Sequence, residues 1–191
     1  MNINSILEEA HFLLSKVVRP GDTVVDATIG NGHDTLFLAK AVGKSGTVFG
    51  FDIQDEAIRK TGERLSRAGE ETQVKLIKDS HHHLDRYIPD SSAVKAAIFN
   101  LGYLPSGDKA ITTRSLTTLK AIQALEKRIA PGGIIAVVFY PGHPEGKKEA
   151  QTIIPYLSSL DQKVWSVLLY RLINQIHEPP FLIAVEKEQA E

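Results

Sequence analysis

The 191-residue chain contains no cysteine, which excludes disulfide bonds, cysteine-ligated zinc and a thiol nucleophile. It also has no apolar run close to the roughly 20 residues that a membrane-spanning helix requires. Acidic side chains, Glu8 and Glu9, stand near the N-terminus where a secretory signal peptide would carry cations. These features predict a cytoplasmic protein that does not interact with membranes.

Neither sign of charge dominates, because the chain has 22 Lys and Arg residues and 23 Asp and Glu residues, which gives a net charge of −1. Non-specific binding to nucleic acid depends on many contacts between cations and phosphates, so the composition argues against a protein that coats nucleic acid. A local basic patch beside one pocket remains compatible with it. The length and the 42% hydrophobic content fit one domain over residues 1–191 with its own core.

Apolar β-branched runs alternate with helical patterns along the chain, without repeats or low-complexity tracts. We expect helices from Ser5 to before Arg19 and at 33–42, 55–68, 80–87 (one short turn), 112–129 and 144–160. The expected strands are 23–27, 47–53, 73–77, 94–101, 133–140, 163–172 and 180–186. Alternation predicts a parallel sheet with helices on both faces, and the last two strands are close enough only for an antiparallel hairpin. The fold class is therefore α/β, a doubly wound Rossmann-like sheet of seven mostly parallel strands.

A glycine-containing turn, Asp26-Ala27-Thr28-Ile29-Gly30-Asn31-Gly32-His33-Asp34-Thr35, follows the first strand. Gly30 and Gly32 allow the backbone to turn tightly and to approach a ligand at a helix N-terminus. Asp52 ends the second strand 20 positions beyond Gly32, where an acid can hydrogen-bond the hydroxyls of a ribose. Either feature alone is an ordinary turn or a solvated acid, but together they predict a nucleoside site.

Two residues favour S-adenosylmethionine (SAM) over a dinucleotide. Thr35 stands where a dinucleotide fingerprint has its third Gly or Ala. Asp26 would disfavour a diphosphate and favour the cationic methionine group of SAM. NAD(P) is the second choice. The residues expected to bind the cofactor are Asp26, Gly30, Asn31, Gly32, Asp34, Asp52, Gln54, Asp79, Ser80 and His81.

Asp79-Ser80-His81-His82-His83 follows the third strand, where an adenine ring would be read at the edge of the sheet. Three histidines in a row suggest a metal, but adjacent helical residues point about 100° apart, whereas metal ligands need a spacing of three or four. We therefore expect no metal site. His81 is interpreted as an adenine or substrate contact.

Asn100-Leu101-Gly102-Tyr103-Leu104-Pro105 and Tyr140-Pro141-Gly142-His143-Pro144 end the fourth and fifth strands. An asparagine followed by glycine and an aromatic residue can present an amide or a carbonyl to a substrate amine. Both segments also contain common turn formers, so a plain turn and a stiff connector are the alternatives.

These two segments and Val25 to Thr35, together with Ala10-His11 and Leu13-Leu14, resemble the class I SAM-dependent methyltransferases of the putative rRNA methylase family, which includes the MnmM (YtqB-type) tRNA wobble-uridine enzymes. The resemblance covers the whole chain. It implies SAM-dependent methylation of the 5-aminomethyl group on uridine or 2-thiouridine 34, in the anticodon loop of tRNA. Methylation of rRNA or of a small-molecule amine is the alternative.

Methyl transfer from a sulfonium to an amine is a direct displacement, so positioning groups and a mild proton acceptor suffice. Asn100 is expected to orient the amine, and His143 to take up the released proton unless water does so. The residues expected to shape the substrate pocket are His11, Tyr103 and Tyr140.

An RNA substrate also requires local cations. A path for phosphates is expected at Lys109, Arg114, Lys147 and Lys148, although each alone is typical of a solvated helix face. The oligomeric state is open, with a homodimer among the states allowed.

Overall fold

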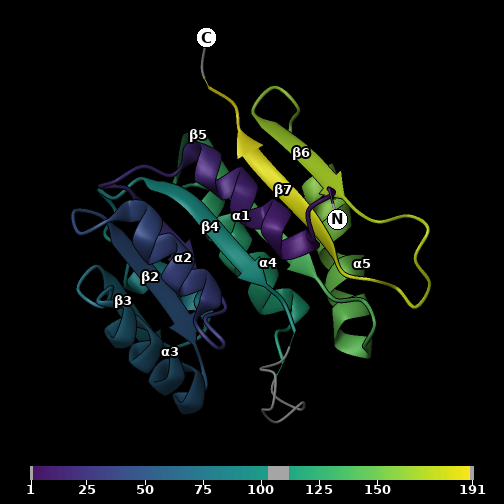
Figure 1. Ribbon diagram of the computed structural model, residues 1–191. Coiled ribbons are helices and arrows are strands. Elements are labelled where there is room, and N and C mark those ends of the chain that lie inside the picture. The colour runs from purple at the N-terminus through teal and green to yellow at the C-terminus, as the bar shows by residue number, and fades with distance from the viewer. Residues whose placement is uncertain (1, 103–111, 190–191) are drawn as a thin grey trace.

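The computed structural model describes residues 2–102 and 112–189, which form a seven-stranded sheet in the order β3-β2-β1-β4-β5-β7-β6 (Figure 1). The first five strands run parallel, and β7 is antiparallel to both β5 and β6. This confirms the predicted fold class, including the closing hairpin. The strands are β1 (Thr23–Asp26), β2 (Thr47–Asp52), β3 (Val74–Lys78), β4 (Val94–Asn100), β5 (Ile129–Phe139), β6 (Trp165–Tyr170) and β7 (Phe181–Lys187).

Helices cover both faces of the sheet (Figure 1). One face carries α1 (Ile6–Val17), α2 (His33–Val42) and α3 (Asp55–Ala68). The other carries the 3₁₀ helix η1 (His81–Arg86), α4 (Ser115–Glu126) and α5 (Pro144–Ser158). Within the described ranges, no helix is both long enough and apolar enough to span a bilayer.

Helix α1 begins with the capping box that the sequence predicts. The Ser5 hydroxyl accepts the Glu8 N–H at 3.4 Å, and the Glu8 carboxylate accepts the Ser5 N–H at 2.8 Å. Both donors would otherwise lack a partner at a helix N-terminus. The cap fixes the start of the helix. Ala10 and Leu14 are buried on its inner face, and His11 follows Ala10 directly.

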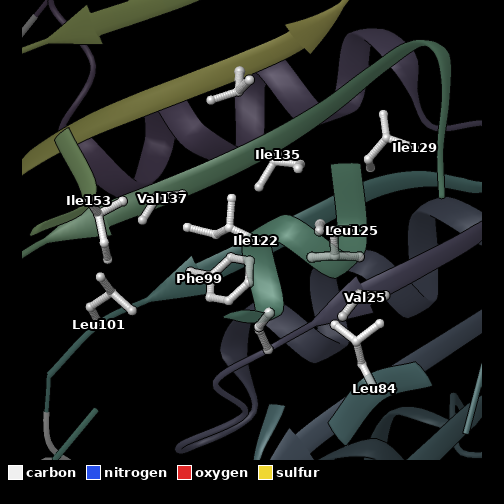
Figure 2. Close-up of a cluster of buried hydrophobic side chains, with 14 of the residues drawn as sticks. Val25, Leu84, Phe99, Leu101, Ile122, Leu125, Ile129, Ile135, Val137 and Ile153 are labelled. Atoms are coloured by element: carbon white, nitrogen blue, oxygen red, sulfur yellow. The ribbon is translucent and has the colours of Figure 1, made fainter. Parts of the chain in front are cut away.

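Strand β4 divides its side chains between two buried clusters. Phe99 packs with Ile122 and Leu125 of α4 on one face (Figure 2), whereas Ile98 belongs to the cluster under α1 and α2. Successive residues of a strand point to opposite faces. Asn100 therefore lies on the side of α1 and α2, at the carboxyl end of the strand.

The main departure from the expected elements lies before β5. A helix through residue 129 and a strand from 133 were expected, but α4 ends at Glu126 and β5 begins at Ile129. Pro131-Gly132-Gly133 lies inside the strand as a bulge, with Gly132 at φ 68° and a register shift opposite β4. The prediction failed because these residues favour turns and bulges alike.

Glu149 of α5 is fully buried and connects α5 to α4 and to the segment that precedes α4. Its carboxylate accepts hydrogen bonds from the hydroxyls of Thr113 at 2.9 Å and Thr118 at 3.1 Å. Thr113 in turn accepts the Gly102 N–H at 2.9 Å. Burial raises the pKa of Glu149 to about 7, because the ionised carboxylate loses its hydration.

We predict that Glu149→Gln flattens the dependence of stability on pH. Since the pKa of Glu149 is higher in the folded than in the unfolded chain, the folded chain binds more protons between pH 5 and 7, and the wild-type free energy of unfolding falls as pH rises. Glutamine cannot ionise, so this part of the decline, on the order of 2 kcal/mol, should disappear. Urea unfolding from pH 5 to 8 measures it, with the exposed Glu71→Gln as the charge control. Parallel curves for Glu149→Gln and the wild type would refute the account.

Candidate active site

A cavity of about 1030 Å³ opens at the carboxyl ends of the parallel strands. Its wall is built from the segments that follow β1, β2, β3, β4 and β5. The strand order reverses between β1 and β4, and ligands of doubly wound folds bind at such a switch point. Most predicted site residues lie in this wall, namely Gly30, Asn31, Asp34, Asp52, Gln54, Asp79, Ser80, His81, Asn100, Tyr140 and His143.

Asp52 holds the glycine turn against the end of β2. One carboxylate oxygen accepts the Gly30 N–H at 3.0 Å, and the other accepts the Gln54 N–H at 3.0 Å. Burial raises the pKa of Asp52, although these backbone donors oppose the shift. Asp52 therefore faces the cavity in an orientation fixed by the backbone.

Gly32 is needed for a reason that the sequence did not indicate. Its φ is +77°, and a Cβ atom there would lie 2.5 Å from the Thr61 hydroxyl of α3. Gly32 is not in the cavity wall; what it allows is the close approach of α3 to the turn. Arg64 of α3 also donates to the Asn31 carbonyl at 2.7 Å.

Asp26 lies beneath the turn, fully buried and outside the cavity wall. It accepts the Thr35 hydroxyl at 2.6 Å and the Thr28 N–H at 3.1 Å. Burial, with a further contribution from nearby Asp34, raises the pKa of Asp26 to about 7. Thr35, where a dinucleotide site would have Gly or Ala, thus serves as the donor for this buried acid.

The three consecutive histidines have three different partners. His82 pairs with the Ser80 hydroxyl at 2.7 Å, and His83 donates to Asp79 at 2.8 Å. Although partial burial opposes it, the hydrogen bonds from His83 and Tyr87 lower the pKa of Asp79 to about 2. Among the residues that the structure describes, no group of three or more His, Asp or Glu side chains is arranged to hold a metal ion.

His81 presents an unsatisfied acceptor within the cavity wall. Its Nδ1 lies 3.0 Å from the Ala27 carbonyl, and because a carbonyl only accepts, Nδ1 must carry the ring hydrogen. Nε2 then bears a lone pair, and it is buried without a partner among the described residues. Burial lowers the pKa of His81 to about 4, so the ring is neutral at pH 7. An N–H or O–H group of a nucleoside cofactor would satisfy Nε2, so the site fits SAM.

Asp34, Asn100 and Tyr140 form a network in the cavity wall, and His11, which lies outside the wall, joins it through Asp34. One Asp34 oxygen lies 2.6 Å from His11 Nε2, and the other accepts from Asn100 Nδ2 at 3.2 Å. The Tyr140 hydroxyl hydrogen-bonds the Asn100 side chain, and burial together with Asp34 raises the pKa of Tyr140 to about 12. Asp34, assigned to the cofactor from sequence, is therefore joined directly to His11 and Asn100, and through Asn100 to Tyr140, which were all assigned to the substrate.

The predicted residues at the start of α5 all have local partners. His143 caps α5, its Nδ1 accepting the Gly146 N–H at 3.1 Å. Lys147 pairs with Glu178 at 2.7 Å and Lys148 with Glu145 at 2.6 Å. Tyr103 and Lys109 lie outside the described residues. Wall residues that the sequence reasoning missed include Leu7, Thr112, Thr113, Thr117, Glu178 and Pro180.

The strand order, the closing hairpin and the nucleoside-type turn define a class I SAM-dependent methyltransferase. A sequence profile described as "Putative rRNA methylase" matches residues 48–186. The chain belongs to the putative rRNA methylase family, which confirms the predicted family and SAM as the cofactor.

Three relatives cover nearly the whole chain. The tRNA (mnm(5)s(2)U34)-methyltransferase of Arabidopsis thaliana chloroplasts is 38% identical over 95% of this chain and 69% of its own. A putative rRNA methylase from Clostridium thermocellum is 46% identical, with a TM-score of 0.95 over 98% of this chain and all of its own. A putative methyltransferase from Streptococcus mutans in complex with SAH is 39% identical, with a TM-score of 0.88 over 97% and 99% of the two chains.

Asp52→Ala should weaken SAM binding by about 1.5–3 kcal/mol, or roughly tenfold to a hundredfold, because a charged acceptor in the cavity wall is lost. Titration calorimetry measures this change. Asp55→Ala is the matched control, since the Asp55 side chain is 81% exposed and pairs with Lys78 on the surface. A dissociation constant unchanged from the wild type would remove Asp52 from the cofactor site.

Proposed function

We propose that this protein transfers the methyl group of SAM to the primary amine of a 5-aminomethyl group on uridine or 2-thiouridine 34 of tRNA, producing the 5-methylaminomethyl nucleoside. The observation that carries the proposal is the 38% identity, over 95% of this chain, to the Arabidopsis thaliana enzyme with that specificity in its name. A likeness of that extent includes both halves of the cavity, and not only the cofactor turn.

For this methyl transfer, the main task of the protein is to position the amine and SAM. Bound SAM supplies a methyl group already activated by its sulfonium, so no covalent intermediate with the enzyme is required. Fixing two reactants in line accounts for roughly 7–11 kcal/mol of barrier lowering. Asn100, at the end of β4 and in the cavity wall, is placed to orient the amine.

Of the lysines expected to contact RNA phosphates, the two that the structure describes are already paired with glutamates. Arg114 lies in the cavity wall, but Lys147 and Lys148 are each paired with a glutamate. If these lysines bind RNA, each must leave its glutamate and pair with a phosphate group instead. The substrate base lies in a single-stranded loop, where turning it into a pocket costs least.

The proposal is tested by incubating the purified protein with SAM and an anticodon stem-loop RNA that contains 5-aminomethyl-2-thiouridine. Mass analysis of the digested nucleosides should show one added methyl group on that nucleoside alone. The same RNA with unmodified uridine is the control. Methyl incorporation into rRNA but not into the stem-loop would overturn the tRNA assignment and favour the rRNA alternative.

Asn100→Ala should lower the single-turnover rate about tenfold to a hundredfold while SAM affinity changes by less than about threefold. An interaction made in the transition state appears in the rate and not in cofactor binding. The backbone N–H of residue 100 retains its bond to Thr28, so the end of the strand should hold its place. A variant that loses SAM affinity but turns over normally once loaded would place Asn100 in the cofactor site instead.

A further inference from the structure

We propose that Asp34, held by His11, is the anionic group that binds the substrate amine and accepts its proton. The inference deepens the proposed function and rests on it, since it concerns the same amine. It reassigns Asp34 from the cofactor to the substrate.

Asp34 is a nearly buried carboxylate at the edge of the cavity. Its side chain is 7% exposed, and it lies in the first turn of α2, where the helix dipole stabilises an anion. One oxygen faces His11 and the other faces Asn100. A carboxylate has about four lone-pair sites, and His11 and Asn100 use two of them. The Asp34 oxygens can therefore accept a further hydrogen bond from a ligand.

The same carboxylate fixes the orientation of Asn100. Because Asp34 only accepts, Asn100 must turn Nδ2 toward it. Asn100 Oδ1 has two lone pairs, so it keeps one for a ligand donor even with the Tyr140 hydroxyl bonded to this side chain. An ammonium carries three donors and fits a corner made of such acceptors. His11 braces the arrangement, since its ring stacks on Phe37 with centroids 4.1 Å apart.

The neighbouring histidines and Tyr140 are poor proton acceptors for this amine. His143 uses Nδ1 to accept the Gly146 N–H, so in the neutral ring the hydrogen resides on Nε2. Tyr140 retains its proton because its pKa is raised to about 12. His81 has a free lone pair, but its ring packs against Phe99, on the opposite side of β4 from Asn100.

The other carboxylates in the wall are engaged elsewhere. Asp52 accepts backbone N–H groups of the cofactor turn, and Asp79 accepts from His83 and Tyr87. Glu178 is about half-exposed and pairs with Lys147. Asp34 is thus the wall carboxylate that is joined to Asn100, the residue placed to orient the amine.

The reaction needs such an acceptor, because a primary alkyl amine resembles the lysine side chain, with a pKa of about 10.4, and is protonated at neutral pH. One N–H bond breaks and its proton passes to the Asp34 carboxylate. The electron pair of the nitrogen then forms the bond to the methyl carbon as the bond from that carbon to sulfur breaks, leaving its electrons on sulfur. The proton reaches solvent after the product leaves, on the side of the 28% exposed His11.

The test compares two anticodon stem-loop RNAs that differ only in carrying 5-aminomethyluridine or the neutral 5-hydroxymethyluridine. Affinity is measured with S-adenosylhomocysteine present, so that no turnover occurs. The wild type should prefer the amine RNA by about tenfold or more, the scale of a charged hydrogen bond. Asp34→Asn should reduce that preference to about twofold and leave the affinity for S-adenosylhomocysteine within about threefold. The exposed Glu71→Gln should behave as the wild type.

His11→Ala should lower the same preference partly, which identifies His11 as a positioning residue, and His11→Gln, which retains an N–H donor, should restore it in part. A wild type without preference for the amine overturns the inference, whether or not the variants fold. So does an Asp34→Asn protein that keeps the preference or loses cofactor affinity instead. Failure of the wild type to methylate the amine RNA would overturn the proposed function itself, which separates the two failures.

Discussion

The hydrogen bond between the Asn100 N–H and the Thr28 hydroxyl, 2.7 Å long, joins the carboxyl ends of β1 and β4 at the point where the strand order reverses. The glycine turn continues from β1, and Asn100 is the last residue of β4. The bond holds these two segments together, so the two halves of the cavity meet along one edge of the sheet. A methyl transferase that relies on positioning requires this fixed junction more than it requires an acid or a base of unusual strength.

The elements of the fold could be predicted from periodicity because each is coded locally. Alternating strand and helix patterns, and the short distance between β6 and β7, were enough to give a mostly parallel sheet with an antiparallel hairpin. The strand order and the bulge at Gly132 depend on pairing between distant segments. A local pattern such as Pro131-Gly132-Gly133 does not distinguish a bulge from a turn.

A residue's place in the cavity wall was predictable where a motif sits at the end of a strand or just after it, as with Gly30, Asp52 and Asn100. What the sequence did not indicate is which of these side chains share a partner. His11 and Asp34 lie 23 residues apart and were assigned to different ligands, yet they contact each other at 2.6 Å. Thr112, Thr113 and Thr117 carry no motif, and they reach the wall because the start of α4 and the residues just before it lie beside the cavity.

The central claim is that one cavity holds the cofactor over the β1 turn and the amine beside Asp34 and Asn100. A crystal structure with S-adenosylhomocysteine and a stem-loop RNA carrying 5-aminomethyluridine tests it most directly. The account predicts the amine nitrogen within hydrogen-bond distance, about 3 Å, of both Asp34 and Asn100, with the sulfur in line beyond it. An amine bound elsewhere, or an Asp34 carboxylate occupied by the cofactor's own ammonium group, would contradict it.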